Sequence, residues 1–250
     1  SNVRREFKPN ITATVLERFR AAGAVTIGRL NMTEFALGPT GHNAIWGDCR
    51  NPWNTAHVPC GSSSGSGAAV AARIVYASLG SDTGGSTRLP ASASGGTGIK
   101  PTHSRVSRHG VMGLSFSVDT PGPIARSAAD LARVLRVIAG HDPLDPTSSR
   151  LPVPDYEGGL TRSIAGLRIG VPRNYFFADV DPVIGASIEA ALGILESLGA
   201  KRVAVSVSLA ERMSELSRAL VYSEATALHG HYLRTQAQDY SPQVRVRAST

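Results

Sequence analysis

Two segments rich in glycine and serine carry most of the residues in this sequence that could do covalent chemistry. The first, GSSSGSGAAVAAR, covers residues 61–73, and the second, GSDTGGSTR, covers residues 80–88. A serine hydroxyl can attack a carbonyl carbon when a base takes its proton and when nearby N–H groups stabilise the oxyanion that forms. Both segments are therefore candidates for the site of a nucleophile.

The first segment has several interpretations. A flexible Gly/Ser linker is disfavoured because ordered elements are expected on both sides of it. A Walker-type phosphate loop needs a lysine after the glycines, and none follows here. The stretch Gly61–Gly65 also fits G-x-S-x-G, the nucleophile elbow, with Ser63 as nucleophile. That motif needs a strand directly before it, and the two prolines of the preceding NPWNTAHVPC argue against one.

In the second segment Ser86 follows two consecutive glycines. The uncovered N–H groups of Gly84 and Gly85 can turn toward one point, as they do in an anion-binding nest. The residues STRLPASAS can begin a short helix, whose N-terminus adds positive potential. This arrangement suits acyl transfer, with a histidine as base, or a neutral lysine acting through a second serine. The alternative is a tight Gly-Gly turn with a capping serine.

The elements around these segments alternate between helical and strand patterns, which predicts an α/β fold with a largely parallel or mixed sheet. Ser127 is expected to cap a helix that has Asp130 in its first turn. Residues 38–63 are expected to form a long ordered loop, and 142–159, with four prolines, is the best candidate for a linker. Helices are expected at 10–23, 67–76, 127–140, 181–199 and 209–233, and strands at 24–28, from 77, at 166–173 and at 201–208.

Composition narrows the class of protein. The 250 residues are 42% apolar and 18% charged, which suits one large domain or two small ones. No apolar run is long enough to span a membrane, and SNVRREFKPN lacks the apolar region of a secretory signal, so we expect a cytoplasmic protein without membrane contact. Cys49 and Cys60 form neither a disulfide framework nor a zinc pattern, and the histidines form no metal motif, so neither metal nor cofactor is expected.

The net charge of +7 raises the question of nucleic-acid binding. The arginines are scattered, and aromatic residues do not alternate with them; the densest basic stretch is HSRVSRHG at 103–110. This distribution favours a solvated basic surface over a nucleic-acid-binding stripe.

The motifs around both segments resemble those of the amidase signature family. The resemblance extends from about Thr12 to Gly140, with weaker similarity from GLRIGVPRNYF to SEATALHGHY. It implies the family's fold, a mixed β-sheet covered by helices on both faces, as one partial domain over residues 1–250. The motifs that carry it are GAVTIGRLNMTEFALGP, RNPWN, GSSSGSGAAVAA, LGSDTGGSTRLPAS, GIKPT and VDTPGPIARSAADLARVLRVIAG.

The resemblance implies a Ser–Ser–Lys triad. Ser86 would be the nucleophile, and Ser62 would be the bridging serine, which follows a cis peptide bond. A non-proline cis bond costs several kcal/mol and is expected mainly at functional sites. The oxyanion hole would consist of the N–H groups of Thr83, Gly84, Gly85 and Ser86.

Other residues are expected around this triad. Ser63, Asp82 and Arg88 would support the site or bind substrate, with Arg88 paired either with Asp82 or with an acidic substrate. His42 is interpreted as an ordinary loop histidine, and Asp119 and Thr120 as turn-forming residues. Cys60 and Ser64 replace common glycines of the signature.

The triad lysine of the family lies upstream of the helix expected at 10–23, and here it would precede residue 1. The chain contains Lys8, Lys100 and Lys201 only. Lys100 matches the lysine of the family's G-x-K-P-T strand, which is not the triad lysine. We therefore expect the chain to be a fragment without the triad lysine and without the C-terminal part of the family's domain.

The implied activity is hydrolysis of a carboxamide C–N bond through a serine acyl-enzyme, with a small-molecule amide as substrate. One alternative is an amidotransferase subunit that releases ammonia from glutamine for tRNA-linked amidation, which would involve nucleic acid indirectly. Another is an inactive fragment or non-catalytic relative. A homodimer is left open.

Overall fold

The computed structural model describes residues 1–249 and consists of two compact units. The first unit is formed by Ser1–Leu160 together with the chain from Leu220 onward, and the second by Thr161–Ala219. The candidate linker 142–159 belongs to the first unit, where Asp142 and Asp145 are buried. The division follows directly after that segment.

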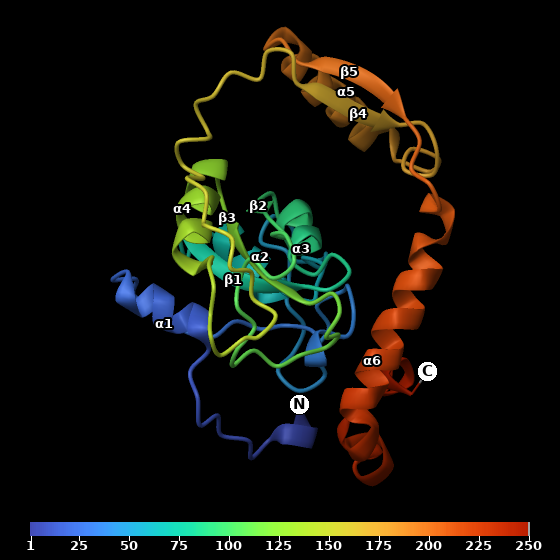
Figure 1. Ribbon diagram of the computed structural model, residues 1–250. Helices are drawn as coiled ribbons and strands as arrows, with labels where there is room; N and C mark the ends of the chain where they lie inside the picture. Colours follow the sequence, from blue (N-terminus) through green and yellow to red (C-terminus); the bar gives the residue numbers. More distant parts are fainter. Residues whose placement is uncertain (250) are drawn as a thin grey trace. The chain divides into compact units, whose positions relative to one another are not determined.

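Helices and strands alternate along much of the chain, although not at every expected position (Figure 1). The first unit contains α1 (Thr14–Ala21), η2 (Glu34–Ala36), α2 (Ser64–Ala71), β1 (Ala77–Asp82), α3 (Arg88–Ala93), β2 (Thr97–Gly98), β3 (Thr120–Ala125), α4 (Ala128–Ile138) and α7 (Pro242–Ala248). The second contains β4 (Arg168–Pro172), α5 (Pro182–Ser197) and β5 (Lys201–Val205), and α6 (Met213–Thr235) crosses the division. Short 3₁₀ turns lie at η1 (Asn2–Arg4), η3 (Ala210–Arg212) and η4 (Ala237–Asp239).

The sheet of the first unit has the order β1-β3-β2 with antiparallel pairing, and helices cover both of its faces. Ile124 of β3 shares a hydrophobic cluster with Val70 of α2, and Leu79 of β1 shares another with Leu135 of α4. Ile124 lies opposite Ser78, and neighbouring strand residues point to opposite faces. Hence α2 covers one face and α4 the other, as expected for this α/β class.

The second unit pairs β4 and β5 in parallel, so the two units together contain both kinds of strand pairing. The α5 helix connects these strands, and Asp181 caps it by accepting a hydrogen bond from the N–H of Val183 at 2.8 Å. In the same way Ser127 caps α4, accepting from the N–H of Asp130 at 3.1 Å. These two helices begin where the sequence predicts because a capping side chain satisfies an otherwise unpaired N–H.

Two expectations about strands need correction. Residues 24–28 are not a buried strand: Val25 is 85% exposed and Ile27 is 66% exposed, and no strand within residues 1–249 pairs with them. Conversely, Thr120 begins β3 and is not a turn residue. The prolines of β3 at 121 and 123 conceal the strand pattern, since proline cannot donate to the ladder.

Pro121 and Pro123 are tolerated in β3 because of the side on which they lie in the hydrogen-bond ladder. The carbonyl of Pro123 accepts a hydrogen bond from the N–H of Ile99, so this residue faces the β2 side. Pro121 is two residues away and faces the same side. Because β2 extends over Thr97–Gly98 only, few donors are lost there.

Helix boundaries also differ from the expected ones. The first helix is shorter than 10–23, and α2 begins three residues before the expected helix 67–76 and ends five residues before its last residue. No helix in the described part of the chain has both the length and the apolar character needed to cross a bilayer.

Candidate active site

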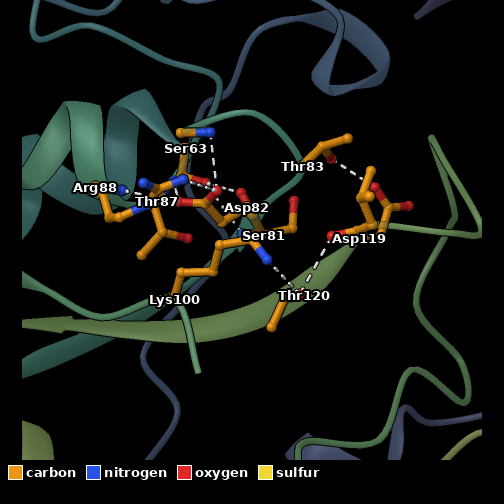
Figure 2. Close-up of polar contacts among 11 residues, drawn as sticks. Ser63, Ser81, Asp82, Thr83, Thr87, Arg88, Lys100, Asp119 and Thr120 are labelled. Carbon is orange, nitrogen blue, oxygen red and sulfur yellow. Dashed lines mark hydrogen bonds and ion pairs between the residues drawn. The ribbon is translucent and has the colours of Figure 1, made fainter. Parts of the chain in front are cut away.

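The buried carboxylate of Asp82, the last residue of β1, organises the loop at 82–88. Its oxygens accept hydrogen bonds from the N–H groups of Gly85 at 2.8 Å and of Thr87 and Arg88 at 3.2 Å each. The Arg88 guanidinium adds two more, at 3.0 and 2.9 Å (Figure 2). The loop is thus folded around one internal anion, as backbone nests fold around bound anions.

The charges of this pair stabilise each other. Burial raises the pKa of Asp82, but hydrogen bonds and the positive charge of Arg88 outweigh it, and the pKa lies below its usual value. The hydrogen bond to Asp82 correspondingly raises the pKa of Arg88. The expected pairing of Arg88 with Asp82 is therefore present, although the Arg88 side chain remains 54% exposed.

The N–H groups expected to form the oxyanion hole fall into two classes. The Gly85 N–H donates to Asp82 and is therefore not free for an oxyanion in this structure. Those of Thr83, Gly84 and Ser86 form no hydrogen bond within the described residues. Gly85 has φ of +126°, and a Cβ there would lie 3.1 Å from Leu89, so the loop requires glycine at this position.

A backbone hydrogen bond brings the two Gly/Ser-rich segments together: the N–H of Ser63 donates to the carbonyl of Ser86 at 3.1 Å. Ser62 has no exposed surface, and its hydroxyl has no hydrogen-bond partner among the described residues. The Gly61–Ser62 peptide bond is cis, as the resemblance implies. The Ser62 carbonyl accepts from the N–H of Thr33 at 3.0 Å, a contact that the sequence did not indicate.

Ser63, the nucleophile of the elbow hypothesis, is buried against β1. Its hydroxyl oxygen accepts from the N–H of Ser81 at 3.2 Å. A Cβ on Gly80 would lie 2.8 Å from the hydroxyl oxygens of both Ser63 and Thr87, so glycine allows this close packing. Residues 55–63 contain no strand, and an elbow needs one before its serine.

Lys100 lies near the loop but is not directed to a serine. Its ammonium donates to the Thr120 hydroxyl at 3.1 Å (Figure 2). His42 lies in the long loop and pairs with Asp48, with 2.9 Å between Nδ1 and Oδ2. Asp119, expected to form a turn, accepts a hydrogen bond from the hydroxyl of Thr83. That contact depends on strand pairing, which motif spacing does not reveal.

The fold and these loops define a chain of the amidase class. A family model described as Amidase matches residues 1–248, and the chain belongs to that family. This match confirms the resemblance to the amidase signature. Similar solved structures confirm the α/β fold expected from it.

Individual relatives are consistent with this assignment. A glutamyl-tRNA(Gln) amidotransferase subunit of Geobacter sulfurreducens is 48% identical over 207 residues, which are 83% of this chain and 43% of the relative. One similar solved structure is an inhibitor-bound vestigial protein complex that reveals the evolutionary origins of an s-triazine catabolic enzyme. It matches with a TM-score of 0.94 and 40% identity, and the match covers 100% of this chain and 54% of that chain. The peptide amidase of Stenotrophomonas maltophilia matches with TM-score 0.83 and 34% identity over 98% and 56%. The chain spans about half the length of the curated relatives it matches.

Proposed function

We propose that this chain carries the acylation site of an amidase that hydrolyses a carboxamide C–N bond, with Ser86 as nucleophile and Ser62 as bridging serine. The observation that carries the proposal is the hydrogen bond from the Ser63 N–H to the Ser86 carbonyl. It joins the segment of Ser62, whose buried hydroxyl has no partner among the described residues, to the loop whose Thr83, Gly84 and Ser86 N–H groups form no hydrogen bond within those residues.

In the proposed reaction the Ser86 oxygen bonds to the amide carbonyl carbon. Its proton passes to Ser62, whose own proton passes to a lysine outside residues 1–250. When the tetrahedral intermediate collapses, the C–N bond breaks and the relay returns a proton to the leaving amine. Water then attacks the acyl-enzyme by the same route, releasing the acid and restoring the Ser86 hydroxyl. These steps need no cofactor.

The oxyanion would be bound by the N–H groups of Thr83, Gly84 and Ser86. One well-aligned donor of this kind contributes roughly 3–4 kcal/mol to transition-state stabilisation. Gly85 contributes indirectly, because its own N–H fixes the loop to Asp82. The substrate that we propose is a small-molecule amide, and the compartment is the cytoplasm.

The test is peptide-mapped labelling of the complete gene product with a fluorophosphonate probe, combined with a screen for ammonia or amine release from amides. We expect one adduct, on Ser86. The variant Ser86→Ala should lose labelling and lose turnover by a factor on the order of 10⁴ or more. An adduct on Ser63 instead would support the elbow and contradict the proposal.

A second candidate is an amidotransferase component, in which glutamine is the amide and the released ammonia passes to a tRNA-linked acceptor. The names of the relatives favour it, because eight of them are subunits of glutamyl-tRNA(Gln) amidotransferases. Under this candidate, glutamine-dependent amidation should require partner proteins and ATP. Efficient hydrolysis of other amides by the isolated protein would argue against it.

A further inference from the structure

The end of the β1–β3 ladder brings together two residues that lie 36 positions apart. Asp82 of β1 pairs with Thr120 of β3 in antiparallel register. One step further, Thr83 therefore stands opposite Asp119, and directly opposed side chains lie on the same face. The Thr83 hydroxyl donates to Asp119 Oδ1 at 2.5 Å (Figure 2).

The carboxylate of Asp119 is buried and has other partners that fix its orientation. Its second oxygen, Oδ2, accepts from the N–H groups of Leu114 at 2.7 Å and Ser115 at 2.9 Å. Both carboxylate oxygens are thus hydrogen-bonded on opposite sides, one to the loop at 114–119 and one to Thr83. Such a doubly bonded, buried carboxylate is a rigid acceptor.

The loop at 114–119 is itself held by α6. The Glu224 carboxylate accepts from the hydroxyls of Ser115 and Ser117, and from the N–H of Ser117 at 3.1 Å. These serine hydroxyls lower the pKa of Glu224, so it stays ionised and keeps accepting near neutral pH. A continuous series of hydrogen bonds thus joins α6 to Thr83 through Asp119.

The loop at 82–88 is consequently fixed at two points. The Asp82 carboxylate holds the C-terminal half of the loop by accepting hydrogen bonds from the N–H groups of Gly85, Thr87 and Arg88. No contact of Asp82 restrains the Thr83 peptide, whose N–H is unpaired within the described residues. Among the described residues, the bond to Asp119 is the one side-chain contact that restrains that side of the loop.

We propose that Asp119 is a positioning residue for the oxyanion hole: through the Thr83 hydroxyl it orients the Thr83 and Gly84 N–H groups toward the developing oxyanion. The inference rests on the proposed function of Ser86. Oxyanion donors act through alignment, and a small displacement lowers the rate of acylation without lowering ground-state affinity in proportion.

The experiment measures saturation kinetics of fluorophosphonate labelling in the complete gene product, because the phosphonyl oxygen occupies the oxyanion position and the natural amide need not be known. In Thr83→Val the shape is kept and only the donor to Asp119 is lost. We expect the maximal labelling rate to fall about tenfold or more, as for a weakened oxyanion donor, with half-saturation changed less than about twofold. Thr83→Ser restores the donor and should recover most of the rate.

Controls separate this role from a general effect on folding. Thr97→Val makes the same exchange in β2, where the hydroxyl donates a long hydrogen bond to the Arg126 carbonyl at 3.5 Å, and should label at the wild-type rate. Asp119→Ala should reduce the rate as Thr83→Val does, and the double variant should be no slower than the slower single variant. Thr83→Ala gives the same information if valine prevents folding.

Two results would overturn the inference. If the wild-type protein forms the Ser86 adduct and Thr83→Val labels at an unchanged maximal rate, the positioning role is wrong while the proposed function stands. If the wild-type protein forms no adduct on Ser86, the proposed function and the inference fall together.

Discussion

The two Gly/Ser-rich segments have similar compositions but opposite environments. Every residue from Gly61 to Gly67 is buried, whereas in the second segment Gly84 is exposed and Thr83 and Ser86 are half-buried. Each segment contains a buried hydroxyl without a partner, that of Ser62 and that of Thr87, and only the second also presents the unpaired N–H groups of Thr83, Gly84 and Ser86, all within the described residues. Small residues in the first allow close packing, and in the second they leave the backbone open to a ligand.

The difference fits the separate tasks that we propose for the two segments. A proton relay benefits from burial, because excluded water cannot compete for the proton, whereas an oxyanion hole must open to the substrate. Exchanging matched residues within each segment tests whether the two tasks are separate.

Among exchanges that leave Ser86 in place, the largest effect is expected at Ser62. The variant Ser62→Ala should reduce kcat/KM by a factor on the order of 10²–10⁴, because the relay is lost. Ser64→Ala is the matched control: Ser64 is also fully buried, and its hydroxyl contacts the Asn31 carbonyl at 3.5 Å. Equal losses of activity in both variants would contradict a relay through Ser62.

The two glycines of the second segment should respond differently to alanine. Gly85→Ala forces φ of +126° on a residue with a Cβ and should destabilise the protein by about 1–3 kcal/mol. At Gly84 an added Cβ meets no atom within 4 Å, so Gly84→Ala should change stability by less than about 0.5 kcal/mol. Urea denaturation measures both values. Similar losses at the two positions would show that the loop is not fixed as described.

A smaller effect is expected from the Asp82–Arg88 pair and depends on pH. Because the folded-state pKa of Asp82 is lowered, its contribution to stability is present above the unfolded pKa, near 3.9, and is lost as pH falls through the folded pKa. Arg88→Gln should cost about 1 kcal/mol at pH 7, a value reduced by the exposure of Arg88. At acidic pH the difference in the free energy of unfolding between Arg88→Gln and wild type should become smaller.

Urea midpoints of wild type and Arg88→Gln between pH 7 and 3 test this dependence. The pKa values of Asp142, Asp145 and Glu224 are lowered as well, so the wild-type curve alone does not isolate Asp82. A difference between the two proteins that stays constant with pH would contradict an electrostatic role for Arg88.

The sequence predicted the parts of this site that lie within one motif. Ser86, its preceding glycines and the short helix after it are local in the chain, and the ion pair from Asp82 to Arg88 spans six positions. The starts of α4 at Ser127 and of α5 at Asp181 could also be predicted from nearby residues, because a capping side chain acts within one turn of its helix.

Contacts that depend on strand register were not predicted. Thr83 meets Asp119 only because β1 and β3 pair antiparallel, and two prolines concealed β3 as a strand. Register is decided by long-range packing, so no pattern within either segment could show it. The strand expected at 24–28 failed for a related reason, since apolar residues form a strand only where a partner strand is available.

The carboxylate of Asp82 has a consequence for how this loop responds to solution conditions. Dissolved ions screen charges that water can reach, and Asp82 has no accessible surface, with every contact at 3.2 Å or less. The backbone contacts of Asp82 should therefore be nearly independent of ionic strength, whereas its contact with the exposed Arg88 guanidinium should weaken as salt is added. If Ser86 is the nucleophile, as we propose, salt can alter how a charged substrate approaches it while these backbone contacts hold the loop in shape.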